Sequence, residues 1–157
     1  TRERAMVDRI ACPWLIKRFI DPDAEFIYVP PQEVLKRAKE LNAVPFDVEN
    51  VELTHFREEN EERVSFDAFI KKYNLRDPAL LELARIVRGA DAKIDNPPPE
   101  SPGLKALARG FREIARHDLE NIKLQFPAYD ALYAYCKMKV AAKHNALSEY
   151  RKSINTG

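Results

Sequence analysis

The spacing of apolar residues along the chain is typical of a protein built mainly from helices. Apolar positions recur every three or four residues through most of the sequence. We expect five to six helices, at about residues 13–20, 31–41, 66–73, 78–89, 104–115 and a long final stretch. In that stretch one apolar seam runs unbroken through Ile122, Phe126, Tyr129, Tyr133, Cys136 and Val140. Aromatic residues at this spacing indicate core packing.

Residue-specific signals mark several helix ends. Pro13 suits a first helical turn, Ser65 is a good N-cap, and Asp77 is a cap followed by proline. Pro127 is expected to start or kink the last helix, because proline lacks the amide hydrogen that bonds one turn back. Four prolines within residues 92–103 predict a stiff, extended connection rather than a domain boundary.

Three short segments have the character of strands, at about residues 25–29, 44–48 and 51–55. The first is aromatic and β-branched between prolines, and the other two alternate apolar and polar residues. Residues 58–63 are strongly charged, and we expect a loop there. The pattern therefore predicts a predominantly helical α+β fold, in which a small sheet is packed by the helices.

Composition limits the classes of protein that remain. With 157 residues we expect one domain, residues 2–153. Because the sequence starts at Thr1, we also expect a region that precedes residue 1. The net charge of +1 argues against nucleic-acid binding by this fragment, and no apolar run approaches the length of a membrane span. Two cysteines fit a reducing compartment, so we expect a cytoplasmic protein.

Cys12 is a candidate reactive thiol. It lies beside a predicted helix start and near Arg9, and both features lower the pKa of a thiol. The alternative is a buried, inert cysteine, which is common in protein cores.

Basic residues near the same helix form a candidate anion site. Guanidinium and ammonium groups at a helix end are suited to an oxyanion. The same residues can equally form the solvated face of an amphipathic helix. The candidates are Arg9, Lys17, Arg18 and Arg88.

A second candidate site would bind a metal. Glu52 and His55 lie three residues apart near a predicted strand end, and Asp91 falls on the buried stripe of its helix if that helix extends so far. A buried carboxylate is costly unless it is paired or bound to metal. His117 and Asp118 precede the last helix and complete the candidate set. Such ligands without thiolates suit Zn, Mn or Fe, but an ion pair between Asp91 and an arginine explains that carboxylate equally well.

Six motifs, in order, resemble the ChrB-type chromate-resistance domain. They are residues 7–21, 45–48, 51–55, 65–69, 86–91 and 129–136, and the likeness runs from about residue 2 to residue 137. The matching positions are Asp8, Arg9, Cys12, Trp14, Arg18, Glu52, His55, Asp67, Arg88, Asp91, Tyr129 and Asp130. Two positions depart from the family pattern: His117-Asp118-Leu119 stands where relatives often have Asp-Asp-His, and Val64 stands where cysteine is common.

The resemblance implies a role in the response to chromate and leaves three hypotheses. The chain is a sensor or accessory domain that binds chromate or a similar oxyanion through the arginines. Alternatively, it is a metal-dependent enzyme of chromate or oxidative-stress detoxification. The third hypothesis is an interaction module that forms a homodimer through the seam from Phe126 to Val140. The resemblance places any DNA contact on the region before residue 1, and we expect no membrane contact.

Overall fold

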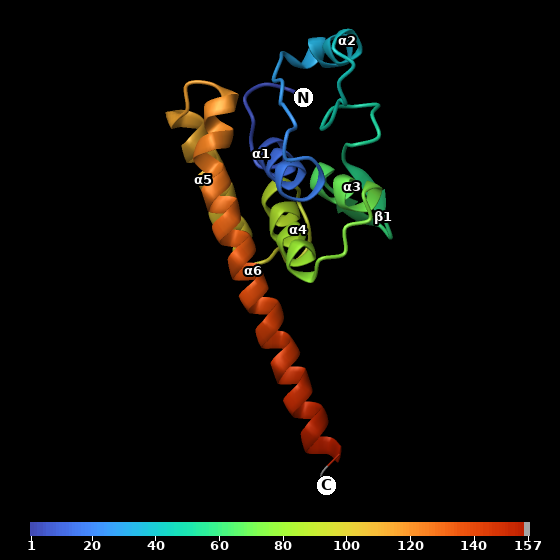
Figure 1. Ribbon diagram of the computed structural model, residues 1–157, viewed down its shortest axis with the longest axis vertical. Helices are drawn as coiled ribbons and strands as arrows, with labels where there is room; N and C mark the ends of the chain where they lie inside the picture. Colours follow the sequence, from blue (N-terminus) through green and yellow to red (C-terminus); the bar gives the residue numbers. More distant parts are fainter. Residues whose placement is uncertain (156–157) are drawn as a thin grey trace.

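Helices account for most of residues 1–155, the part of the chain that the computed structural model describes (Figure 1). This confirms the predominantly helical α+β class. A π-helical turn, η1 (Ile16–Ile20), and a short 3-10 turn, η2 (Pro31–Glu33), accompany the α-helices. The α-helices of these residues are α1 (Asp8–Leu15), α2 (Val34–Glu40), α3 (Ser65–Lys72), α4 (Pro78–Asp91), α5 (Ser101–Ile114) and α6 (Asp118–Asn155).

The sheet forms elsewhere than the sequence pattern predicted. Strands β1 (Phe56–Glu58) and β2 (Glu61–Arg63) pair antiparallel, with Phe56 opposite Arg63. The segment 58–63, predicted as a loop, contains all of β2 and the last residue of β1. It turns back on itself because Glu59 and Asn60 both take the positive φ angles that a tight hairpin turn requires.

The three segments predicted as strands hold only single bridges. Val29 bridges to Arg2, and Phe46 bridges to Leu53, each in parallel orientation. The prediction that residues 25–29, 44–48 and 51–55 form strands is therefore wrong. Asp47 and Asn50 have positive φ angles, and these turn the backbone away from an extended course after a single pair.

Helix α1 begins earlier than predicted and contains Pro13 in its interior. That proline cannot donate to the carbonyl of Arg9 one turn back. The hydroxyl of Tyr28 donates to this carbonyl instead. A side chain from the segment predicted as a strand thus satisfies the carbonyl that the proline leaves open, and the chain continues through Pro13 into η1.

Three later helix ends also differ from prediction. Helix α4 continues past Gly89 to Asp91, α5 starts at Ser101, and α6 starts at Asp118 and passes through Pro127. Ser101 packs on Gly89, where any Cβ would overlap its hydroxyl, and that hydroxyl donates to the carbonyl of Ile86. The extension of α4 places Asp91 at the end of the helix, beside α1.

The core lies where α6 packs against α1 and α4 (Figure 1). Trp14 is fully buried, and its ring contacts those of Phe19, Tyr129 and Tyr133. Tyr129 and Cys136 of the seam are buried as well. The seam that the homodimer hypothesis assigns to an interface thus packs against other helices of the same chain, as the aromatic spacing indicated. Among residues 1–155, no helix is long and apolar enough to cross a membrane.

Candidate functional site

Three carboxylates converge on one nitrogen of His55. Its Nε2 lies 3.2 Å from an oxygen of Asp91, 3.4 Å from one of Asp8 and 3.5 Å from one of Asp47. Four segments contribute: the start of α1, the turn after Phe46, the residue before β1 and the end of α4. One ligand atom each from Asp8, Asp47 and His55 lies within 4.8 Å of the others. We call these four residues the His55 cluster.

The first turn of α3 holds the carboxylate of Asp8. The amides of Ser65 and Phe66 donate to its two oxygens, at 2.6 and 3.1 Å. An anion at a helix N-terminus satisfies amides that have no partner within the helix. Asp8 is nevertheless fully buried, and burial raises its pKa to about 6, with further contributions from Asp91 and Asp47. Burial is thus the main reason that the pKa of Asp8 is raised.

Asp47 is positioned by its backbone and by two arginines. Its φ angle of 54° is in the left-handed region, which aspartate tolerates better than most residues. Arg2 and Arg9 both donate to its Oδ2 at 2.9 Å. The hydroxyl of Ser65 donates to Oδ1, the oxygen that faces His55. One oxygen of Asp47 is therefore neutralised by arginine and the other points into the cluster.

His55 carries a proton in this arrangement. Hydrogen bonds to Asp8 and Asp91 raise its pKa to about 11, against the opposing effect of burial. The imidazolium thus supplies the positive charge among the carboxylates. One imidazole nitrogen with carboxylate oxygens is also the donor set that Zn, Mn and Fe accept, with the cation in place of the proton.

The predicted metal ligands are only partly brought together. His55 and Asp91 meet, but Glu52 pairs with Lys72 on the surface. His117 accepts a hydrogen bond from the amide of Glu120, and Asp118 accepts from the amides of Arg4 and Ala5. Glu52, His117 and Asp118 thus have other partners in the structure and do not join this cluster.

Sequence reasoning missed Asp8 and Asp47 as site residues. Both stand in motifs shared with the family, and their position there was the only available signal. Their separation along the chain follows no ligand spacing, and only the fold brings them together.

The basic residues predicted to bind an anion each pair with a different group. Arg88 makes a two-bond ion pair with Asp67, and Arg18 makes one with Asp130. Lys17 donates to the carbonyl of Pro22. Arg9 alone of the four borders the cluster, through Asp47. Each of these groups thus has its own partner in the structure, and anion binding by the set stays a prediction.

Cys12 does not have the environment of a reactive thiol. Its side chain is fully buried, and its sulfur lies 3.8 Å from an oxygen of Asp8. Burial and the negative charge of Asp8 raise its pKa well above the ordinary value. The helix start that was expected to activate the thiol lies at Asp8, and its carboxylate has the opposite effect.

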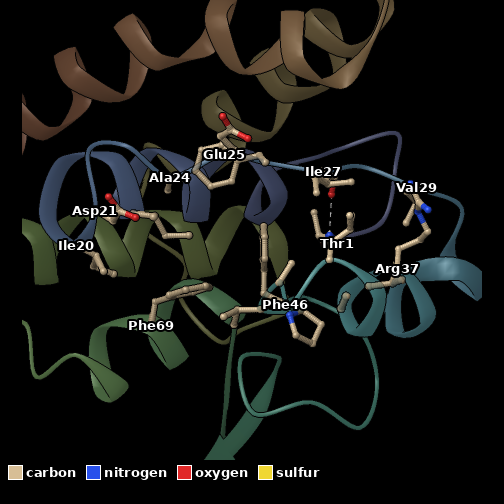
Figure 2. A pocket seen from close by; sticks show the side chains of 18 of the residues that line it. Thr1, Ile20, Asp21, Ala24, Glu25, Ile27, Val29, Arg37, Phe46 and Phe69 are labelled. Atoms are coloured by element: carbon tan, nitrogen blue, oxygen red, sulfur yellow. Dashed lines mark hydrogen bonds between the residues drawn. The ribbon is translucent and has the colours of Figure 1, made fainter.

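Two cavities border the segments of the cluster. Ile20, Phe46 and Phe69 line a largely apolar cavity of about 310 Å³ (Figure 2). A polar cleft of about 400 Å³ lies between the β1–β2 hairpin and the end of α4, and Glu62 and Arg88 are among its lining residues. The apolar cavity adjoins the cluster along the chain, because Phe46 precedes Asp47. The polar cleft adjoins it in space, because Glu62 lies 3.4 Å from Nδ1 of His55.

Comparison with known proteins identifies the family. A model of the ChrB C-terminal domain matches residues 1–136. Protein ChrB of Cupriavidus metallidurans is 32% identical over 136 residues, which are 86% of this chain and 39% of that relative. The chain thus spans about two fifths of the relative's length. No solved structure matches the chain. The chain therefore belongs to the ChrB C-terminal domain family, a family associated with chromate resistance.

Proposed function

We propose that the domain binds one divalent metal ion through Asp8, Asp47 and His55, and that this centre serves the chromate response associated with its family. The observation that carries the proposal is the approach of three carboxylates to Nε2 of His55, at 3.2 to 3.5 Å. Asp91 is the nearest of the three to Nε2, but it lies outside the set of Asp8, Asp47 and His55 whose ligand atoms are all within 4.8 Å of one another.

The charges of the cluster suit a divalent cation. Arg2 and Arg9 pair with Asp47. Protonated His55 lies between Asp8 and Asp91, so three positive groups face three carboxylates. A divalent ion would balance the carboxylates of Asp8 and Asp91 and leave His55 neutral, the form in which imidazole binds metals.

The ligand types narrow the choice of metal. The donors are one imidazole nitrogen and carboxylate oxygens, with no thiolate among them. Zn, Mn and Fe accept such mixed sites, whereas Mg and Ca prefer oxygen alone. Three protein ligands leave open the coordination position that a catalytic or ligand-binding metal needs.

In this proposal chromate, or a similar oxyanion, binds at the open position of the metal. Direct capture by Arg9, Arg18 and Arg88 has weaker support, since each guanidinium already pairs with a carboxylate. A metal ion with an open coordination position would instead bind the oxyanion directly as a ligand. The anion and metal hypotheses from the sequence are thereby combined in one site.

Titration of metal-free protein with Zn, Mn and Fe(II) tests the metal site. We expect one equivalent to bind, and His55→Ala to abolish binding. His117→Ala is the matched control, because it removes a histidine that the fold keeps in a local hydrogen bond. Absence of binding by the wild-type protein, or equal loss in both variants, would overturn the proposal.

Thermal unfolding with added chromate tests the role of the centre. Chromate should raise the melting temperature of the metal-loaded protein and leave the metal-free protein unchanged. If both respond equally, chromate does not bind through the metal. The absorption spectrum of the recovered chromate shows whether the bound anion is still chromate.

A further inference from the structure

Glu62 faces the ring nitrogen of His55 that lies away from the carboxylates of the cluster. Its Oε1 is 3.4 Å from Nδ1 of His55, while Nε2 faces Asp8, Asp47 and Asp91. The two ring nitrogens therefore have separate partners. One nitrogen is directed at the position where a cation would bind, and the other at a single carboxylate on the surface.

The β1–β2 hairpin connects His55 to α3. His55 is the residue before β1, and β2 leads through buried Val64 to Ser65, whose amide donates to Asp8. The hairpin is thus anchored at both ends by residues of the cluster or in contact with it. Glu62 stands opposite Arg57 in this hairpin, so its position is set by strand pairing.

We infer that Glu62 is a positioning residue for the metal site, which accepts the Nδ1 hydrogen of His55 and thereby holds Nε2 toward the metal. This inference rests on the proposed metal function. A metal-bound histidine commonly donates its other ring hydrogen to a carboxylate, and this fixes the tautomer and ring orientation. Metal binding at Nε2 would make the Nδ1 hydrogen a stronger donor to Glu62.

A general stabilising role explains Glu62 less well. Its side chain is 40% exposed and that of His55 is 35% exposed. An ion pair so open to solvent contributes little to folding. The orientation of the ring matters much more to a metal than to the fold, so loss of Glu62 should appear in metal affinity.

Glu61 provides a matched control. It is the neighbouring residue of β2, carries the same charge and is 63% exposed, but it pairs with Arg63 rather than His55. Replacing either glutamate removes one negative charge from the same hairpin. Any long-range effect of charge on the metal is therefore shared by the two variants.

The test compares Zn affinity and the visible spectrum of the Co(II)-loaded protein in Glu62→Leu, Glu62→Gln and Glu61→Leu. We expect Glu62→Leu to weaken affinity by about 10- to 100-fold and to change the Co(II) spectrum. Glu62→Gln retains an acceptor oxygen and should recover part of the affinity. Glu61→Leu should keep the wild-type spectrum and an affinity within a few-fold.

Equal affinities and spectra in the Leu variants at positions 61 and 62 would overturn the role of Glu62 while leaving the metal site intact. A wild-type protein that binds no metal would overturn the proposed function, and this inference with it. Urea unfolding of each metal-free variant shows whether a loss of affinity reflects a loss of fold. Unchanged unfolding midpoints are expected, and a midpoint that falls in step with affinity would contradict a positioning role.

Discussion

At the scale of single residues, Asp8 links three helices through one side chain and its own amide. Its carboxylate accepts from the first two amides of α3, and its amide approaches Asp91 at the end of α4. It is itself the first residue of α1. These contacts fix where the carboxylates of the cluster lie relative to His55.

The protonation of His55 predicts how stability depends on pH. Hydrogen bonds to Asp8 and Asp91 raise its pKa from 6.5 to about 11 in the folded protein. The resulting contribution to stability is fully present below pH 6.5 and is lost as the pH rises toward 11. The metal-free protein should therefore become less stable over this range, as measured by urea unfolding at a series of pH values.

Two comparisons check this prediction. The pH dependence should be weaker in His55→Asn and unchanged in His117→Asn. Metal should reverse the trend, since binding at His55 requires the neutral ring and so strengthens with pH. A pH profile unaltered by His55→Asn would show that other groups set the stability in this range.

The residues of the cluster differ in how far the sequence could predict them. His55 and Asp91 were candidates because a histidine near a strand end and an acid on a buried stripe are local signals. Asp8 and Asp47 carry no such signal, because their contacts join segments far apart in the chain. The sequence pattern placed Glu62 only in a charged loop. Its proposed role depends on a hairpin whose turn holds Glu59 at a positive φ angle, which a residue such as glutamate rarely adopts.

At the scale of elements, helices were predicted better than strands. Helical spacing extends over many residues and still predicts a helix around local exceptions such as Pro13. There the hydroxyl of Tyr28 donates to the carbonyl that the proline leaves without a partner. The predicted strands were about five residues long, and one turn at Asp47 reduced two of them to a single bridge. Short strands depend on partners that the local sequence does not identify.

Lys139 of α6 joins α4 to the start of α5. Its ammonium lies 2.9 Å from both Glu82 and Glu100. We expect Lys139→Met to lower the free energy of unfolding by about 2 kcal/mol, since hydrogen bonds between charged groups are lost. Chemical denaturation measures this, and Lys123→Met, at an exposed position of the same helix, should have little effect.

The effect of Lys139→Met should also depend on pH. The hydrogen bond from Lys139 lowers the pKa of Glu100 from 4.5 to about 2. This contribution is complete above pH 4.5 and is lost as the pH falls toward 2. The difference between wild type and variant should therefore shrink on acidification. A constant difference would mean that Glu100 is not part of the interaction.

At the scale of the whole molecule, α6 extends well beyond the other helices (Figure 1). Residues 141–154 are all exposed, and they include Leu147, Tyr150 and Ile154 at a spacing of three and four. The family match ends at residue 136, before this part of the helix. The chain up to Cys136 thus contains the packed core and the His55 cluster.

Removal of the chain from Asn145 onward should leave the domain folded. Exposed residues contribute little to stability, so we expect a change within about 0.5 kcal/mol in urea unfolding and unchanged metal binding. Light scattering before and after truncation tests whether two copies associate through this end of α6 rather than through the seam from Phe126 to Val140. A large loss of stability together with a fall in mass would show that two copies associate through this end of α6.

The most direct test of the metal centre is anomalous diffraction from crystals of the zinc-loaded protein. A metal centre at the His55 cluster predicts one peak, about 2.0–2.2 Å from Nε2 of His55 and from oxygens of Asp8 and Asp47. A peak at His117, or no peak with Nε2 of His55 still in direct contact with the carboxylates, would contradict it.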